Sequence, residues 1–285
     1  MATTSAREGR LISQGLLLRY LEWGPADGPA LILLHGLRSY GHTWEPVALP
    51  LAGRWRVIAL DQRGRGESAW DPDHQYYADA YVRDLEALVR RLGLRHFVLG
   101  GHSMGGANAF VYATRHPEKL IGMVIEDMGP GASAGSDGAE RIKRELLATP
   151  ERFDTWAAAE AFWRGQRPGI SEAALRSRLR HSLREEADGR IRWKHDARGI
   201  AAARLGATPE QLVDLWPHVD AVSVPTLVLR GARSDFLSAA TAREMAGRNP
   251  LLTCVDIPDA GHYVHDDNLP AFNAALAPFL DGLIS

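Results

Sequence analysis

The stretch "VLGGHSMGGAN", residues 98–108, places Ser103 between two pairs of glycines. Within it, "GHSMG" (101–105) fits the pattern G-x-S-x-G, which marks a serine held on a sharp turn between a strand and a helix. The pattern alone occurs by chance in many chains, so its flanks decide its meaning. An apolar run, "FVLG", precedes it, and a helical segment, "ANAFVYATRH", follows it. These flanks favour a strained turn with an exposed serine over a flexible loop.

Six short apolar runs are spread along the chain around this turn, at 30–36, 56–61, 96–101, 120–127, 225–231 and 251–258. They are continuously apolar, which is typical of strands buried on both faces of a parallel sheet. Helical patterns lie between or after them, at 76–92, 104–116, 237–247 and 268–281. The alternation predicts an α/β fold with a doubly wound, mostly parallel sheet.

The alternation of strands and helices is interrupted once. After "VIEDMGP" comes "GASAGSDGAE", whose Gly, Ser and Ala content predicts a mobile link over residues 129–138. From residue 139 to about 217 the patterns are helical, without a strand-like run. We therefore predict a core made of residues 1–130 and 223–285, and a helical cap of residues 131–222 over the carboxyl ends of the strands.

The composition excludes several classes of protein. The chain has 285 residues, of which 45% are hydrophobic and 24% charged, and its formal net charge is −2. This balance is ordinary for a globular protein and lacks the basic surface of a nucleic-acid binder. The chain shows no signal peptide and no apolar run long enough to span a membrane. Its single cysteine, Cys254, rules out an internal disulfide and a cysteine zinc cluster. We expect a cytoplasmic protein with a small-molecule substrate and neither nucleic-acid nor membrane partners; the oligomeric state stays open.

A serine hydroxyl becomes nucleophilic only beside a base, and the base needs an acid that orients it. The candidate base is His262, which follows the last predicted strand and comes last in chain order, as this type of turn requires. Two aspartates compete for the acid. Asp235 follows the penultimate strand, 27 residues before His262, and Asp127 lies 24 residues beyond Ser103, after the strand that follows the serine turn. The residues alone leave both open.

These features together resemble the α/β-hydrolase family over about residues 10–283. The matching segments are His35-Gly36, "DQRGRGES" (61–68), "GHSMGGAN" (101–108), the helical insertion and "AGHYVHDD" (260–267). The resemblance implies an α/β-hydrolase fold with a cap inserted after the sixth strand. It also implies a serine hydrolase, since the dehalogenases of this fold carry an aspartate at the turn.

Within the family, the chain resembles the acetamidomethylene-succinate hydrolases. The likeness lies in "DQRGRGES", "LRGARSDFLSAA" (229–240) and "GHYV" (261–264), which contains His262. Those enzymes take their acid from the position after the sixth strand, which corresponds to Asp127. They lack an aspartate that matches Asp235. The resemblance therefore favours Asp127 over Asp235.

The implied reaction is the hydrolysis of a small carboxylic ester or lactone through an acyl-enzyme on Ser103. The backbone N–H groups of Leu37 and Met104 would form the oxyanion hole. A C–C bond or amide hydrolase would use the same triad, and a non-catalytic ligand-binding protein is the alternative from another class. The reaction needs no metal and no organic cofactor.

Three further residues are candidates for contact with the substrate. Arg38 follows the oxyanion position and could bind a substrate carboxylate. Trp163 and Trp193 lie in the predicted cap and could line an apolar pocket. A solvated arginine and ordinary packing between cap helices would explain the same three residues.

Overall fold

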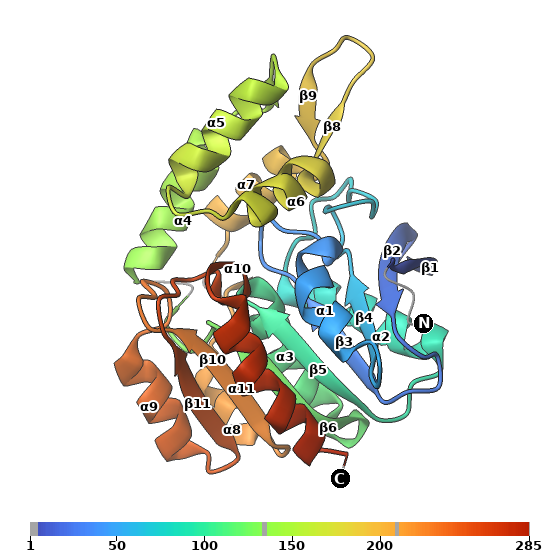
Figure 1. Ribbon diagram of the computed structural model, residues 1–285, viewed down its shortest axis with the longest axis vertical. Helices are drawn as coiled ribbons and strands as arrows, with labels where there is room; N and C mark the ends of the chain where they lie inside the picture. Colours follow the sequence, from blue (N-terminus) through green and yellow to red (C-terminus); the bar gives the residue numbers. More distant parts are fainter. Residues whose placement is uncertain (1–4, 133–135, 209–210, 285) are drawn as a thin grey trace.

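An eight-stranded sheet forms the core of the molecule in the residues that the computed structural model describes, which are 5–132, 136–208 and 211–284 (Figure 1). The strands are β1 (Arg7–Ser13), β2 (Leu16–Trp23), β3 (Ala30–Leu34), β4 (Arg56–Leu60), β5 (Phe97–His102), β6 (Leu120–Glu126), β10 (Thr226–Gly231) and β11 (Leu252–Ile257). Their order is β1-β2-β4-β3-β5-β6-β10-β11. The pairs β1–β2 and β2–β4 are antiparallel, and the other neighbours are parallel. The predicted doubly wound, mostly parallel sheet is confirmed.

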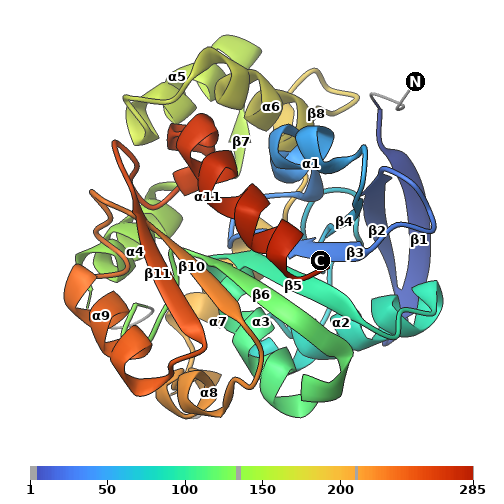
Figure 2. The same ribbon diagram turned by 60° about the horizontal axis from the view of Figure 1, so that its bottom comes forward.

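Helices cover both faces of this sheet (Figures 1 and 2). On one face, α2 (Ala78–Leu92), α3 (Met104–Arg115), α8 (Trp216–Ala221) and α9 (Ala239–Arg248) share one apolar cluster with the strands. On the other face, α1 (Glu45–Leu51) and α11 (Leu269–Gly282) contribute to a second cluster. Short helical turns, η1 (Gly41–Trp44), η2 (Pro117–Lys119) and α10 (Val264–Asp267), connect these elements. None of the described helices combines the length and apolarity needed to cross a membrane.

The hairpin β1–β2 was not expected from the sequence, because charged residues interrupt its apolar pattern. Two of them are nevertheless buried: Arg19 is 5% exposed and Glu22 is 8% exposed. Arg19 forms an ion pair with Asp61, and Glu22 forms ion pairs with Arg7 and Arg56. Paired charges can enter a sheet that unpaired charges would destabilise.

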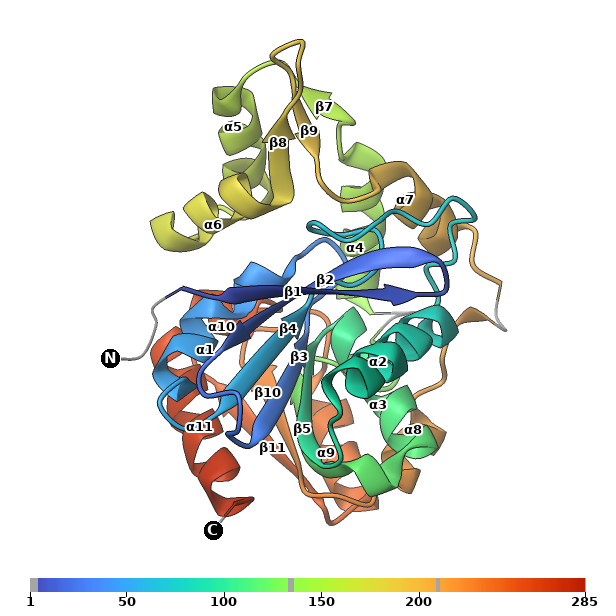
Figure 3. The same ribbon diagram turned by 90° about the vertical axis from the view of Figure 1, so that its right-hand side faces the viewer.

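The cap forms a separate layer above the carboxyl ends of the strands (Figure 3). Its helices are α4 (Asp137–Ala148), α5 (Trp156–Gln166), α6 (Glu172–Ser182) and α7 (Ala197–Leu205). The described part of the cap also contains an antiparallel sheet, β7-β9-β8, built from β7 (Arg152–Phe153), β8 (Leu183–Glu185) and β9 (Ile191–Trp193). The prediction of a cap without strands is therefore wrong, because strands of two or three residues are too short to produce a sequence pattern.

The boundaries of the cap also differ from the prediction. The helix α8 falls inside the predicted range 131–222, yet it packs on α3 and α9 of the core. The chain returns to the core before this helix, since α7 ends at Leu205. Residues 133–135 of the predicted mobile link lie outside the described residues.

The two halves of the cap contact the core differently. Ile142 and Leu146 of α4 belong to the apolar cluster of the core. The half made of α5, α6 and β7–β9 has an apolar cluster of its own. That half meets the core through ion pairs and ring contacts. Arg167 contacts Asp266 and Asp267 at 2.7 Å each, and Arg178 contacts Asp266 at 2.6 Å. The ring of His181 stacks on that of His42, with centroids 3.9 Å apart.

Candidate active site

Ser103 lies on the sharp turn between β5 and α3. Its backbone angles, φ 51° and ψ −119°, fall in a region that non-glycine residues rarely adopt, so the turn is strained. The neighbouring glycines are required sterically. A Cβ on Gly101 would lie 2.3 Å from the backbone of Gly105, and a Cβ on Gly105 would lie 2.3 Å from the carbonyl oxygen of Leu34. The glycine pattern quoted first is therefore explained by backbone contacts.

His262 links Ser103 to Asp127 through two hydrogen bonds. Its Nε2 lies 3.0 Å from Ser103 Oγ, and its Nδ1 lies 2.8 Å from Asp127 Oδ2. With the proton on Nδ1, the imidazole donates to the carboxylate and accepts from the serine hydroxyl. The three side chains come from the ends of β5 and β6 and from the turn after β11, and all are buried.

The surroundings of Asp127 and His262 set their protonation. Burial raises the pKa of the Asp127 carboxyl above its usual value, and hydrogen bonds from Ser234 Oγ and from the N–H of Gly231 offset only a part of this rise. Burial lowers the pKa of His262 to about 4, and the charge of Arg141 acts in the same direction. His262 is therefore neutral at neutral pH, which is the form that can accept a proton.

Asp235, the other candidate acid, is engaged elsewhere. Its carboxylate accepts two hydrogen bonds from Arg141 of α4, at 2.7 Å from Nε and 2.9 Å from Nη2. Arg141 holds the pKa of Asp235 below its usual value. In the described structure, the carboxylate that hydrogen bonds to His262 is that of Asp127, and Asp235 joins the cap to the core.

The two N–H groups predicted for an oxyanion hole lie beside the serine. Met104 is the first residue of α3, and Leu37 follows the His35-Gly36 turn. Both residues line a cavity that also contains Ser103. Neither backbone N–H has a hydrogen-bond acceptor among the described residues. They are thus available to a bound oxygen.

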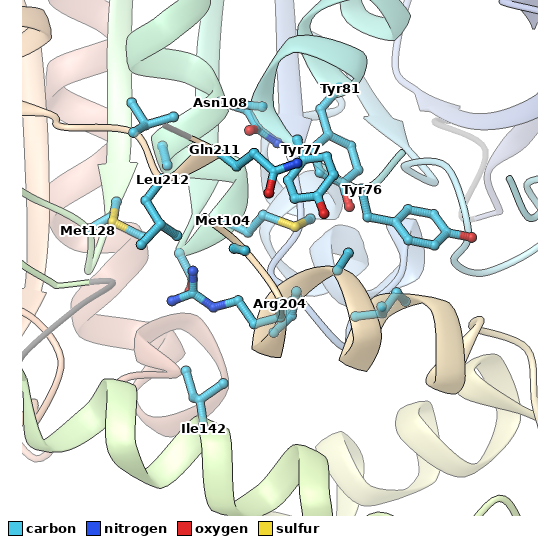
Figure 4. Close-up of a pocket in the computed structure, with 18 of the residues that line it drawn as sticks. Tyr76, Tyr77, Tyr81, Met104, Asn108, Met128, Ile142, Arg204, Gln211 and Leu212 are labelled. Carbon is cyan, nitrogen blue, oxygen red and sulfur yellow. The ribbon is translucent and has the colours of Figure 1, made fainter. Parts of the chain in front are cut away.

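Two cavities open beside Ser103 within the described part of the chain. The larger has a volume of about 110 Å³ and is mostly apolar; Figure 4 shows its wall between the core and the cap. Its lining includes Leu37, Tyr77, Met104, Met128, Ile142, Ile200, Ala203, Leu212 and Phe236. The smaller has a volume of about 20 Å³ and is lined by Leu37, Arg38, Ser39, His102, Ser103, Glu145, Trp163, Arg178, His262 and Tyr263, among others.

The three predicted substrate contacts lie in different places. Arg38 lines the smaller cavity, but it is paired with Glu145 of α4 and donates to Thr149 Oγ1 at 2.9 Å. Trp163 lines the same cavity. Trp193 lines neither cavity beside Ser103; it is packed in the apolar cluster of the cap, where its Nε1 donates to the carbonyl of Pro150.

A second pair of buried groups holds the turn that carries His262. Glu126 accepts the backbone N–H of His265 at 3.0 Å and its Nδ1–H at 2.8 Å. His102 Nε2 lies 2.8 Å from the carbonyl oxygen of His262. These contacts, like those of Ser234, were not expected from the sequence. The nearest signal was the position of Glu126 directly before Asp127 in the chain.

A metal site is not built from the described residues, since no three His, Cys, Asp or Glu side chains among them are grouped to hold an ion. The thiol of Cys254 hydrogen bonds to the carbonyl of Ala242, and burial raises its pKa to about 11. It lies on β11, and neither cavity beside Ser103 is lined by it.

Comparison with known proteins shows which family the chain belongs to. Residues 29–269 match the family described as "alpha/beta hydrolase fold". The chain is 30% identical to 2-(acetamidomethylene)succinate hydrolase of Mesorhizobium japonicum, with 90% of this chain and 89% of that protein covered. It is 31% identical to 3-hydroxybutyrate-oligomer hydrolase of Cupriavidus necator, with 86% of each covered. The crystal structure of E-2-(acetamidomethylene)succinate hydrolase superposes with a TM-score of 0.85 at 29% identity, over 97% of this chain and 99% of the other. The resemblance inferred from the sequence is confirmed, and this chain, a hydrolase, belongs to the α/β-hydrolase family.

Proposed function

We propose that this hydrolase cleaves a small carboxylic ester or lactone through an acyl-enzyme on Ser103. The observation that carries the proposal is the unbroken chain of hydrogen bonds from Ser103 Oγ through His262 to Asp127. A nucleophile, a base and an orienting acid in this order make up the Ser-His-Asp arrangement of acyl-transfer enzymes.

In the first half of the reaction, Ser103 Oγ attacks the carbonyl carbon while His262 Nε2 takes the hydroxyl proton. Asp127 stabilises the imidazolium that results. When the tetrahedral intermediate collapses, the bond from carbon to the leaving oxygen breaks, and His262 gives its proton to that oxygen. The acyl group stays on Ser103.

In the second half, a water molecule replaces the leaving group. His262 takes a proton from the water as its oxygen attacks the acyl carbon, and then returns the proton to Ser103 Oγ. The carboxylic acid leaves. Each proton transfer uses the same imidazole, whose pKa burial keeps low enough for it to start as the free base.

The N–H groups of Leu37 and Met104 would hold the oxyanion in both halves. They have no other acceptor among the described residues, and the N-terminus of α3 adds its positive dipole end at Met104. One such donor is worth about 10²–10³ in rate.

The relatives support hydrolysis but differ in what they act on. The protein of Cupriavidus necator is named for hydrolysis of 3-hydroxybutyrate oligomers, and a relative from Mycobacterium tuberculosis, 28% identical, is named an esterase. A relative from Pseudomonas putida, 29% identical, is named N-formylmaleamate deformylase. Two of these three names indicate an ester, which is therefore the first substrate class to test.

The test is covalent labelling with a fluorophosphonate, which reacts with an activated serine. We expect one label per chain, on the peptide that contains Ser103, and we expect Ser103→Ala to abolish both labelling and ester turnover. Ser5→Ala, which changes an exposed serine far along the chain from the turn, should label as the wild type does. Labelling that survives in Ser103→Ala would contradict the proposed nucleophile.

A further inference from the structure

The two cavities beside Ser103 differ in chemistry, and a substrate cleaved at Ser103 must place one part in each. We propose that the substrate is an ester of an apolar carboxylic acid with a short alcohol that bears a hydrogen-bond acceptor oxygen. The acyl chain would occupy the larger cavity, and the alcohol the smaller. This inference rests on the proposed function, since it assigns the two sides of the bond that Ser103 breaks.

The position of His262 decides which cavity takes the leaving group. In acyl transfer the imidazole that accepts the serine proton donates it to the leaving oxygen, so that oxygen must lie beside His262 Nε2. His262 lines the smaller cavity, together with Tyr263 and His102. The larger cavity is lined by Ser103, Met104 and Leu37, and Phe236 stands at its border with the imidazole, with ring centroids 4.2 Å apart. The smaller cavity is thus the leaving-group side.

Two side chains that line the smaller cavity, Trp163 and Arg178, carry buried donors that have no acceptor in the described structure. The Nε1–H of Trp163 and the Nε–H of Arg178 are both without a hydrogen-bond partner among the described residues. Trp163 is 2% exposed and Arg178 is 3% exposed, so water cannot easily satisfy them. A buried donor without an acceptor is costly, and a ligand oxygen that accepts its hydrogen bond removes that cost.

The charges of this cavity are already matched. Arg178 is paired with Asp266, and Arg38 is paired with Glu145. The unpaired N–H groups of Trp163 and Arg178 therefore need an acceptor oxygen rather than a counter-charge. A hydroxyl, a carbonyl or a carboxylate can supply such an oxygen. The volume of about 20 Å³ restricts the alcohol to a few heavy atoms.

The larger cavity suits an apolar acyl chain. Its volume is about 110 Å³, and most of its wall is apolar, with Ile200 and Ala203 of the cap facing Met104 and Met128 of the core. Polar side chains also line it, among them Arg65, Asn108, Arg204 and Gln211, of which Figure 4 labels the last three. Burial of each further methylene should raise kcat/KM about fourfold until the cavity is full.

The first experiment uses a pair of isomeric esters, methyl hexanoate and pentyl acetate. They have the same composition and differ only in the side of the ester bond on which the long chain lies. We expect kcat/KM for methyl hexanoate to be at least about tenfold higher. Equal values, or a preference for pentyl acetate, would overturn the assignment of the cavities.

A variant that fills the larger cavity tests the same assignment. Ala203→Phe should lower the ratio of kcat/KM for methyl hexanoate over methyl acetate. Ala202→Phe makes the same change at the preceding residue of α7, which is exposed, and should leave that ratio at its wild-type value. An unchanged ratio in Ala203→Phe, with its serine still labelled by fluorophosphonate, would show that the acyl chain binds elsewhere.

The second experiment varies the alcohol at constant hexanoyl chain. We compare propyl, 2-hydroxyethyl and carboxymethyl esters in the wild type and in Trp163→Phe, which removes the Nε1–H and keeps an aromatic ring. Because the intrinsic reactivity of each ester is the same for every variant, the change in the ratio of kcat/KM reports binding alone. We expect the preference for the 2-hydroxyethyl over the propyl ester to fall about fivefold in Trp163→Phe. A larger fall with the carboxymethyl ester would identify a carboxylate as the preferred acceptor.

Trp193→Phe is the matched control, because the Nε1–H of Trp193 is satisfied inside the cap by Pro150. It should leave the ester preference unchanged. If Trp163→Phe changes no ratio, or if wild type prefers the propyl ester over both oxygen-bearing esters, the proposed leaving group is wrong. Failure of the proposed function looks different, because then wild type neither takes up the fluorophosphonate at Ser103 nor hydrolyses any of these esters.

Discussion

Replacement of Asp127 by asparagine should lower kcat for ester hydrolysis by about 10³–10⁴. Three donors converge on this carboxylate, from His262, Ser234 and Gly231, and only an acceptor-only group can satisfy all three. Asparagine offers one oxygen and one amide. The amide N–H of asparagine would therefore point at one of these three donors, or His262 would have to take the tautomer that cannot accept the serine proton.

The magnitude follows from the loss of charge beside the imidazolium. At the observed separation of 2.8 Å and an effective dielectric constant of about 20, the pair attracts by about 6 kcal/mol, which corresponds to about 10⁴ in rate. The carbonyl dipole of asparagine would recover a part of this. A shift to the wrong tautomer alone costs up to about 10⁴ in kcat.

The assay combines kcat for an ester, the rate of fluorophosphonate labelling, and thermal melting to establish the folded fraction. Asp235→Asn is the matched control: it removes the same charge from a partly exposed pair with Arg141, and we expect its kcat to stay within about threefold of wild type. If folded Asp127→Asn keeps more than a tenth of the wild-type kcat, or if Asp235→Asn loses as much as Asp127→Asn, the assignment of the acid is refuted.

Three further outcomes are expected. Gly105→Ala should lower Tm sharply and slow serine labelling, because its Cβ would meet a backbone oxygen of β3 at 2.3 Å. A Cβ on Gly53 would meet no atom within 4 Å, so Gly53→Ala should keep the wild-type Tm and labelling rate. Burial alone would lower the pKa of His265, but Glu126 raises it above its usual 6.5, so this stabilisation is complete below pH 6.5 and is lost as pH rises through the raised pKa. The Tm difference between wild type and Glu126→Gln should therefore be larger at pH 6 than at pH 9, and a difference that grows with pH would contradict the pairing. Amide hydrogen exchange over residues 129–132 and 136–138 should be fast in the free protein and slow in the fluorophosphonate adduct, while equal rates would indicate a rigid cap.

Much of the fold could be predicted because its signals are local. Each of the six predicted strands corresponds to a strand of the sheet. Five of them are buried on both faces, which explains their continuous apolar runs, whereas β11 lies at the edge of the sheet and is partly exposed. The hairpin β1–β2 gave no such signal, because its stability depends on ion pairs with Asp61 and Arg56, which lie far along the chain. The strands of the cap were not predicted for another reason. A strand of two or three residues is too short to show the alternation of apolar and polar residues.

The site shows the same division between local and long-range information. Ser103 was evident from the glycines around it, whose role is local. The choice between Asp127 and Asp235 depends on side-chain directions set by a positive φ of 49° at Asp127 and by Arg141 in the cap, neither of which spacing reveals. The unpaired donors of Trp163 and Arg178 could not be predicted, because an absent partner is a property of the packed structure.

The way the outer half of the cap is attached has a consequence for how it can separate from the core. Its own apolar cluster stays intact when α5 and α6 move away, but separation breaks the stacking of His181 on His42 and the contact of Arg178 with the ring of Tyr263. Separation also removes the attraction of Arg167 and Arg178 for Asp266. Hydration of the freed charges offsets most of that loss. The inner half is also tied to the core by charges, since Arg141 of α4 pairs with Asp235 and Glu145 of α4 pairs with Arg38. High ionic strength should therefore weaken the partly exposed pair Arg141–Asp235 first, because a buried pair such as Arg178–Asp266 is screened much less.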